Sequence, residues 1–444
     1  MIRRVVVAAA AVAAIGAVVV SARLGGEEPM PAEPFSGEVT PAAQPVACPG
    51  PVEIPVGEIE GGDPALGSGS DDRTYAGEGG AAGTEPLGTG FLVRGDAGAS
   101  VERIGAGDVA GLAAAACVAP TRDQWLVGGS TTLGSSARLV LSNPSDATTE
   151  ATVTYYGPLG ELEERTVATL AAGAQREILL EGVVPEVSAL AMRIVATGAG
   201  VVAHLQDSRL DGFQAAGTDW VGRGAVPSTS LVVAGVGGAG AESLLRIMAP
   251  EGATASLTLT GEDGIVEWGG VTALSLEPGV VTEVEVPQVE GGSIEITADS
   301  PVVAAAMMRE PREIQDGPAG SFAYDLAWTA AQDVSDRLAR SVVVTDHVTA
   351  VTVHAPATAD FELTDASGAV VASTTVTART SATIPLEVAP GTTLTAQGRF
   401  TWVLVLEDEP GFLARVAPRR IDVEPLVVEV GQRPYVGPWA VLED

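Results

Sequence analysis

Residues 137–146 read ARLVLSNPSD, an alternating apolar run that stops at Pro144. The arrangement returns as LRIMAPEGA around Pro250 and as VTVHAPATA around Pro356, and these three prolines are separated by 106 residues in each case. Recurrence at a fixed spacing indicates repeated structural units. Alternation predicts a strand with one buried face, and proline, which has no N–H to donate, suits the end of a strand. We therefore expect this stretch to be a building block of the fold and not part of a site.

The segments that follow each proline also match one another. TVTYYGPLG (152–160), SLTLTGEDG (256–264) and FELTDASG (361–368) each predict a strand that ends in a glycine turn. Later segments, such as GSIEITADSPVVAAAMMRE in the second copy, predict hairpins, and Trp220 and Trp328 close the first two copies. Trp439 lies where a third closing residue would fall. Short strands with turn signals every 8–12 residues are typical of a β-sandwich.

The predicted fold is therefore all-β, with three tandem β-sandwich, immunoglobulin-like repeats after a smaller N-terminal β region. The expected boundaries are a signal or anchor helix at 1–23, a disordered linker at 24–47, the N-terminal β region at 48–126, repeat 1 at 127–229, repeat 2 at 230–332, repeat 3 at 333–433 and a C-terminal tail at 434–444.

The first 23 residues carry an export signal, because Arg3 and Arg4 precede an apolar stretch from Val5 to Val20. This stretch could be cleaved after Ala22, or it could remain as a short membrane anchor. Either way, the rest of the chain is expected outside the cytoplasm, membrane-anchored or secreted. The following Pro-, Gly- and Glu-rich residues have no periodicity and predict an extended linker.

The chain has two cysteines, Cys48 and Cys117. Two lone cysteines in an exported protein most often pair, so we expect a disulfide that staples the N-terminal β region. Two buried free thiols are the alternative.

The composition excludes some classes of partner. The formal net charge is −33 in 444 residues, and all 24 basic residues other than histidine are arginines. Such an acidic chain repels nucleic acid and anionic lipid surfaces. The acidity is expected to serve solubility, and cation binding or a basic partner is the alternative.

Two longer strings resemble a known family. They are CVAPTRDQWLVGGSTTLGSSARLVLSNP (117–144), with the second cysteine, and AHLQDSRLDGFQAAGTDWV (203–221), with Trp220. The chain resembles, from about Cys48 onward, the actinobacterial exported proteins grouped as domain-of-unknown-function family 5719. The resemblance implies an exported or membrane-anchored envelope protein. It implies no catalytic residues, because the family has none assigned.

The most distinctive polar stretch is QDSRLDGFQAAGTDW (206–220). We interpret it as a loop at one end of repeat 1, where loops of sandwiches commonly carry binding. The candidate partner-binding residues are Asp207, Arg209, Asp211, Asp219 and Trp220. A structural loop is the plainer reading, and Ca²⁺ binding by the aspartates is a further alternative, although the spacing of a calcium loop is lacking.

The other motifs are weaker indications of a functional site. GVGGAG (235–240) matches a dinucleotide fingerprint, but the segment that follows is a repeat strand and not a helix. His204, Asp207 and Ser208 are too close along one strand to converge as a triad, and the spacing of His347 and His354 does not suit zinc. Tyr155, Tyr156 and the closing tryptophans could stack on sugars or plug cores.

We therefore predict a protein that is not an enzyme and needs no cofactor, and that acts as a binding or scaffold module in the cell envelope. Its expected partner is an envelope protein or a cell-wall glycan. The alternative function is an array of modules that bind a wall polysaccharide, and a hydrolase is the third candidate.

Overall fold

The computed structural model describes residues 35–39, 44–53, 69–77, 84–94, 98–212, 214–238, 240–313, 322–334, 339–408, 411–421 and 426–430. The chain divides into two compact units, one formed by residues 1–42 and 423–444 and the other by residues 43–422. The described residues form strands and two single-turn 3₁₀ helices, η1 (Gly107–Val109) and η2 (Leu180–Gly182). None of their helices is long and apolar enough to cross a bilayer.

In the smaller unit, β1 (Phe35–Val39) pairs antiparallel with β33 (Leu426–Val430). This pairing corrects two sequence-based boundaries. Residues 24–47 are not linker throughout, and repeat 3 does not extend to residue 433, because LVVEV at 426–430 pairs with the N-terminal segment. The proposed helix at 1–23, the tail at 434–444 and Trp439 lie outside the described residues.

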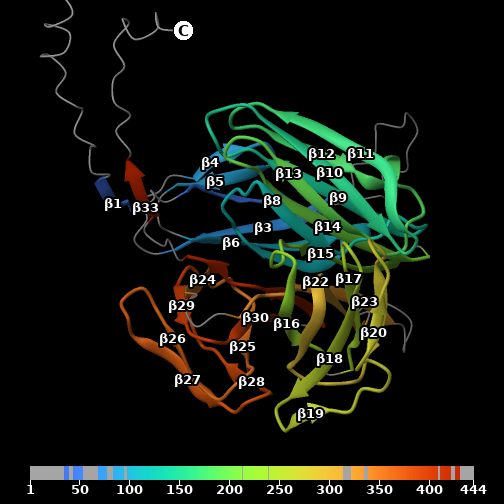
Figure 1. The fold of residues 1–444 in the computed structure, drawn as a ribbon, viewed down its shortest axis with the longest axis vertical. Coiled ribbons are helices and arrows are strands. Elements are labelled where there is room, and N and C mark those ends of the chain that lie inside the picture. The colour runs from blue at the N-terminus through green and yellow to red at the C-terminus, as the bar shows by residue number, and fades with distance from the viewer. Residues whose placement is uncertain are drawn as a thin grey trace, which may run out of the picture. The chain divides into compact units, whose positions relative to one another are not determined.

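The larger unit begins with the N-terminal β region, drawn in blue in Figure 1. It contains two three-stranded sheets, with the orders β2-β5-β4 and β3-β6-β7. A disulfide joins Cys48 in β2 to Cys117 directly after β7, which confirms the predicted pair. The ambiguous Ala-rich segment before Cys117 is strand β7, and it is buried along its whole length. The strands are β2 (Val46–Cys48), β3 (Gly69–Ala76), β4 (Thr84–Leu87), β5 (Gly90–Val93), β6 (Ala99–Ala106) and β7 (Gly111–Ala116).

Strands β8 to β15, which we call sandwich 1, form two four-stranded sheets with the orders β11-β10-β13-β8 and β12-β9-β14-β15. Because β8 pairs with β13, sandwich 1 begins at Asp123, a few residues before the predicted boundary. The strands are β8 (Asp123–Val127), β9 (Ser135–Ser142), β10 (Thr149–Gly157), β11 (Gly160–Leu170), β12 (Gln175–Leu179), β13 (Ala191–Ala196), β14 (Val202–Asp211) and β15 (Gln214–Val221).

The opening decapeptide is strand β9 and its terminator. Leu139 and Leu141 are fully buried in the core between the two sheets. Beyond the strand end, the Asn143 side chain donates to the carbonyls of Ala147, Leu170 and Ala171. These bonds fix the turn at Pro144, where the ladder cannot continue.

Strands β16 to β23 form sandwich 2. Its sheets share one long strand, β22, whose first half pairs with β16 and β18 and whose second half pairs with β17 and β23. The predicted hairpin over this segment is wrong, because the chain passes through Asp299 and Pro301 without turning back. The strands are β16 (Ser228–Val236), β17 (Glu242–Met248), β18 (Ala253–Gly261), β19 (Gly264–Val266), β20 (Leu274–Leu276), β21 (Thr282–Val286), β22 (Gly292–Glu313) and β23 (Phe322–Ala330).

Strands β24 to β32 form sandwich 3, with the sheets β27-β26-β29-β24-β32 and β28-β25-β30-β31. Its core is built around Phe361, Phe400 and Trp402. The strands are β24 (Ala339–Val343), β25 (Val348–Ala355), β26 (Ala359–Thr364), β27 (Val370–Val376), β28 (Thr380–Pro385), β29 (Thr393–Gln397), β30 (Thr401–Asp408), β31 (Phe412–Val416) and β32 (Arg419–Arg420).

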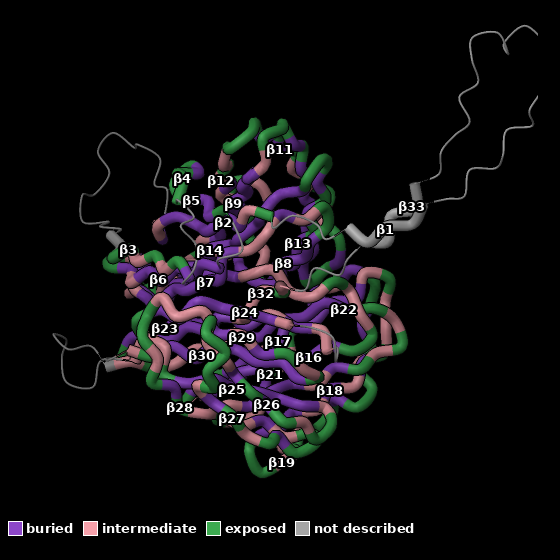
Figure 2. The backbone as a smooth tube through the Cα atoms, turned by 90° about the vertical axis from the view of Figure 1, so that its left-hand side faces the viewer, coloured by how far each residue is buried: buried purple, intermediate pink, exposed green. Residues whose placement is uncertain are grey.

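The last long strands of the four β regions, β7, β15, β23 and β31, lie side by side, and we call them the central junction. β15 contacts β7 and β23, and β31 contacts the same two strands. Figure 2 shows mostly buried (purple) backbone in the middle of this unit, whereas exposed segments are mostly outer turns such as the one beside β19. The end of repeat 1, where the sequence predicts an exposed binding loop at residues 206–220, therefore lies in the interior of this unit.

Candidate functional site

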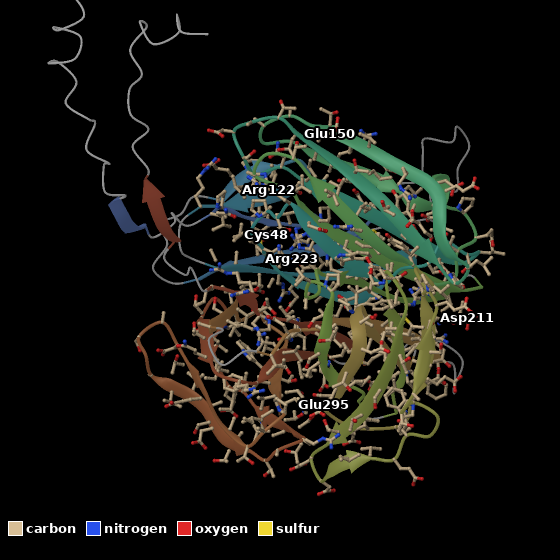
Figure 3. All side chains as sticks on the ribbon, in the orientation of Figure 1. Cys48, Arg122, Glu150, Asp211, Arg223 and Glu295 are labelled. Carbon is tan, nitrogen blue, oxygen red and sulfur yellow. A yellow bond between two sulfur atoms is a disulfide. The ribbon has the colours of Figure 1, made fainter. Side chains whose placement is uncertain are left out.

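The stretch 206–220, predicted as an exposed binding loop, is the β14–β15 hairpin of the central junction. Asp207 and Asp219 face each other in the ladder, and both are fully buried. Asp211 beside the Gly212 turn is the exposed exception, as labelled in Figure 3. The loop prediction is therefore wrong for this stretch, because its polar side chains bond to neighbouring β regions and so tolerate burial.

Asp207 links sandwich 1 to sandwich 2. Its carboxylate makes two bonds with the Arg209 guanidinium, at 2.9 and 3.0 Å. The Oδ2 atom also accepts a hydrogen bond from the Trp328 indole N–H at 3.0 Å. Arg209 therefore compensates the buried charge, and Trp328 is held across the joint between the two sandwiches.

Asp219 joins three strands of the central junction. Its oxygens accept backbone N–H groups from Ala114 in β7 at 3.2 Å and from Trp328 in β23 at 2.7 Å. Burial raises the pKa of Asp219 well above its ordinary value, against the lowering effect of these N–H groups. A carboxylate occupied by backbone donors is poorly placed to ligate a cation.

Asp325 in β23 has the same role and was missed by the sequence reasoning. Its Oδ2 atom accepts N–H groups from Leu112 in β7 at 3.1 Å and from Leu413 in β31 at 3.0 Å. Burial raises its pKa to about 7. An acid within the apolar strand AYDLAW was the available signal, because a buried acid needs donors from another element.

Trp220 is buried against Arg138. The Arg138 guanidinium lies 5.8 Å from the indole centroid, within the range of a cation–π contact. Arg138 also pairs with Glu53 at 2.7 Å and with Glu177 at 2.8 Å, which ties the N-terminal region to sandwich 1. The Trp220 Nε1–H has no hydrogen-bond acceptor among the described residues.

A cavity of about 300 Å³ lies at one end of the central junction, and we call it the central cavity. Ala114, Trp220 and Trp328 contribute apolar wall, and the polar residues His204, Arg223, Gln332, Arg340 and Arg415 also line it. Burial, followed by the charge of Arg223, lowers the pKa of His204 to about 4, so its imidazole is neutral at pH 7. No sequence pattern predicted this cavity, because its walls come from all four β regions.

A second hollow of about 320 Å³, which we call the hairpin cleft, lies near the β14–β15 turn. Arg209 and Asp211 line it, together with Leu133, which is 95% exposed. Of the five predicted partner-binding residues, these two are therefore placed at a surface depression.

The remaining candidate residues lie apart. His347 bonds to Glu102 of the N-terminal region at 2.7 Å, whereas His354 bonds to Glu295 of sandwich 2 at 3.1 Å. Among the described residues, no group of three or more His, Cys, Asp or Glu side chains could hold a metal ion. Tyr155 and Tyr156, considered for sugar stacking, are buried in the core of sandwich 1.

The glycine-rich motif at 235–240 joins strand β16 to strand β17, so a dinucleotide site, which needs a helix here, is not formed. Gly235 (φ +73°) and Gly237 (φ +85°) take left-handed conformations, and their carbonyls accept hydrogen bonds from Arg415 of sandwich 3. The motif therefore serves a joint between sandwiches 2 and 3.

A family model matches residues 89–389 of the chain, and it is that of DUF5719, a family of unknown function. No curated protein and no solved structure matches the chain.

Proposed function

Because the chain belongs to domain-of-unknown-function family 5719, for which no activity is described, we propose a function from the structure. We propose a non-enzymatic protein on the outer side of the cytoplasmic membrane, acting as a rigid scaffold that docks an envelope protein. Residues 1–23 would export or anchor it, and sandwiches 1 to 3 would act as tandem immunoglobulin-like repeats.

The observation that carries the proposal is the way the four β regions are locked together. Glu102 of the N-terminal region pairs with His347 of sandwich 3, and Arg73 pairs with Asp346 beside it. Thr260 and Glu295 of sandwich 2 bond to His354 of sandwich 3. The Arg73–Asp346 pair is exposed, whereas the bonds of Glu102 and His354 are buried or partly buried, and such bonds between domains fix their geometry. A spacer that positions a partner needs fixed geometry.

The Cys48–Cys117 disulfide supports an extracytoplasmic location. It lies in the core of the N-terminal region, where both cysteines are buried. Such disulfides form and persist in oxidising compartments. This agrees with the export signal expected at residues 1–23.

The hairpin cleft supports docking by a protein. Leu133 exposes a large apolar side chain beside Arg209 and Asp211, and an apolar anchor with a charged rim is typical of protein interfaces. The alternative, a polysaccharide-binding array, needs aromatic side chains facing solvent. Four of the described tryptophans, Trp125, Trp220, Trp328 and Trp402, are instead 4% exposed or less, and Trp268 alone among them is partly exposed, which favours the scaffold.

The test measures which components of an envelope extract are retained by the immobilised full chain. The same measurement is made on a matched pair of variants. Leu133→Asp places a charge in the cleft, whereas Leu159→Asp changes another leucine, 97% exposed, which does not line it. The extract is used untreated, after protease treatment and after digestion with wall hydrolases.

A protein partner should be lost after protease treatment and should be retained less by Leu133→Asp than by Leu159→Asp. Retention that survives protease but not the hydrolases would favour the glycan array. Equal retention by the two variants would remove the cleft from the proposal, and no retention in any extract would contradict a binding role.

A further inference from the structure

The charge of the central cavity is opposite to that of the protein. Five arginines and two aspartates line it, in a chain whose net charge is −33. Asp123 is paired with Arg193 at 2.5 Å, outside the lining. The lining arginines are Arg223, Arg340, Arg415, Arg419 and Arg420. The cavity is therefore a local cationic site.

Two of these arginines are explained by the fold. The Arg340 guanidinium pairs with Asp333 and donates to the Phe400 carbonyl. Arg415 donates to the carbonyls of Gly235, Gly237 and Ala414. Both side chains join neighbouring segments, and neither needs a ligand to account for its position.

Arg223 is different. Its Nη1 atom donates to the Ala119 carbonyl at 3.2 Å and to Thr121 Oγ1 at 3.3 Å. Among the described residues, no carboxylate lies within 4 Å of its guanidinium, and its Nε and Nη2 atoms have no acceptor there. Arg223 is partly exposed, and the burial of the rest of its side chain lowers its pKa.

Three of the lining residues also carry buried polar atoms without a partner among the described residues. Trp220 Nε1, on a side chain 2% exposed, has no acceptor, and Gln332 Oε1 and Gln124 Oε1 have no donor. Buried polar atoms without partners are uncommon in folded proteins and call for an explanation. These three atoms are closed off from the cavity itself, so the donors available to an oxyanion are those of Arg223.

The cavity also has room for an organic body. Ala114, Ala115 and Ala116 present small side chains, and Trp220 and Trp328 present indole rings. Small-molecule sites begin at about 300 Å³ and combine apolar walls with a few placed polar groups. The central cavity has that size and composition.

We propose that the central cavity is a binding site for a small organic anion, whose carboxylate or phosphate group pairs with the Arg223 guanidinium. The apolar part of the ligand packs on the alanine wall. A ligand held here touches all four β regions, so binding also stabilises the joints between them. This inference does not depend on the scaffold function, since either could hold alone.

The test is isothermal titration calorimetry and thermal unfolding of the full chain at pH 7 and fixed ionic strength. The probes are benzoate, which combines a carboxylate with a ring, and inorganic phosphate, which is an oxyanion without an organic body. Benzamide, which has nearly the same shape as benzoate but no charge, is the control probe. We expect saturable binding of at least one anion with a raised Tm, and no binding of benzamide.

The variants are Arg223→Gln, which removes one of the five arginines of the cavity, and Arg165→Gln as its control. Arg165 is an arginine of the outer strand β11 that bonds to Glu161 and does not line the cavity. Figure 3 labels Arg223 where the upper strands of the view approach the lower ones. We expect about 10- to 100-fold weaker anion binding by Arg223→Gln, the range for a lost charge-assisted bond, and unchanged binding by Arg165→Gln.

Folding is measured separately from binding. Because Arg223 has no carboxylate partner among the described residues, Arg223→Gln loses only the bonds to the Ala119 carbonyl and to Thr121 Oγ1, and it should unfold at a temperature close to that of the native chain. A folded Arg223→Gln protein that has lost the anion-dependent rise in Tm supports the site. Equal anion effects in both variants, saturable binding of benzamide as tight as that of benzoate, or the absence of saturable binding of both benzoate and phosphate would each overturn it.

Discussion

At the central junction, buried carboxylates take the place of backbone acceptors between strands. Asp219 and Asp325 accept hydrogen bonds from backbone N–H groups of strands in other β regions. Each carboxylate therefore joins strands that are not paired with one another in a β-ladder. The cost is desolvation, which shows in the raised pKa of both groups. The Asp325 Oδ1 atom has no partner among the described residues, so this cost is only partly offset.

Asp325→Asn should therefore stabilise the protein at neutral and higher pH. The folded pKa of Asp325 is about 7, above the ordinary 3.8, so the folded state holds a proton that the unfolded state has released between these values. This contribution to stability is complete below pH 4 and is lost as pH rises through 7. Three pKa units correspond to roughly 4 kcal/mol at most. Asn removes the charge and keeps an acceptor for the two N–H groups.

The measurement is urea unfolding of both proteins from pH 5 to pH 8. We expect the advantage of Asp325→Asn to be largest at pH 8 and to shrink toward pH 5. His204, with its pKa lowered to about 4, acts in the opposite direction, because its stabilising effect is lost as pH falls from about 6.5. It is common to both proteins and cancels in the difference. Parallel pH profiles would show that Asp325 is not a titrating group.

At the central junction, the start of strand β7 lies so close to its neighbours that glycine is required at position 111. A Cβ atom on Gly111 at the start of β7 would lie 2.6 Å from Asp325 Oδ1 and 2.6 Å from the backbone nitrogen of Thr218. Neither neighbour can move without losing bonds of the junction. Gly182 in η2 has no atom within 4 Å of the same position, which makes it a matched control.

We therefore expect Gly111→Ala to lower the free energy of unfolding by about 1–3 kcal/mol, the range for overpacking a filled interior. Gly182→Ala should change it by less than about 1 kcal/mol. Equilibrium denaturation of both variants checks this. Equal effects of the two substitutions would mean that the contact between β7 and β15 is looser than described.

The disulfide acts on the N-terminal β region in particular. Its two sheets are small, and the bridge closes a loop with a sequence separation of 69 residues. In the chain-entropy account such a closure stabilises by roughly 4 kcal/mol. Replacing both Cys48 and Cys117 by alanine should remove about that much, with protease cleavage appearing first in this region. Unchanged stability of the double variant would show that the region is held by its contacts with the sandwiches alone.

At the scale of the whole molecule, the repeated strand pattern was readable from the sequence, whereas the junction was not. Periodicity around Pro144, Pro250 and Pro356 reports which face of a strand is buried, and the structure places strands at each of these positions. The stretch 206–220 has polar residues that looked exposed, because no local pattern shows that Asp219 bonds to residues 105 and 109 positions away. The role of Arg223 could not be predicted from the sequence either, because the cavity that it lines is formed by residues of all four β regions.

The contacts among the four β regions also predict how the larger unit unfolds. Separate sandwiches on linkers would melt one by one. Here Asp325 of sandwich 2 accepts from the N-terminal region and from sandwich 3, and Arg246 of sandwich 2 donates to the Ser188 carbonyl of sandwich 1 at 3.0 Å. A region that unfolds alone would leave these buried polar groups without their partners, and each such loss costs about 1–3 kcal/mol.

We therefore expect residues 43–422 to unfold in one cooperative transition. Phe361→Ala, which removes a ring buried in the core of sandwich 3, should cost about 3–5 kcal/mol and lower the midpoint reported by Trp125 and Trp220 in sandwich 1. The check is differential scanning calorimetry together with hydrogen exchange of sandwich 1 in the variant. If Phe361→Ala instead produces an early transition confined to sandwich 3, with exchange in sandwich 1 unchanged, then the regions are coupled too weakly to act as one rigid scaffold.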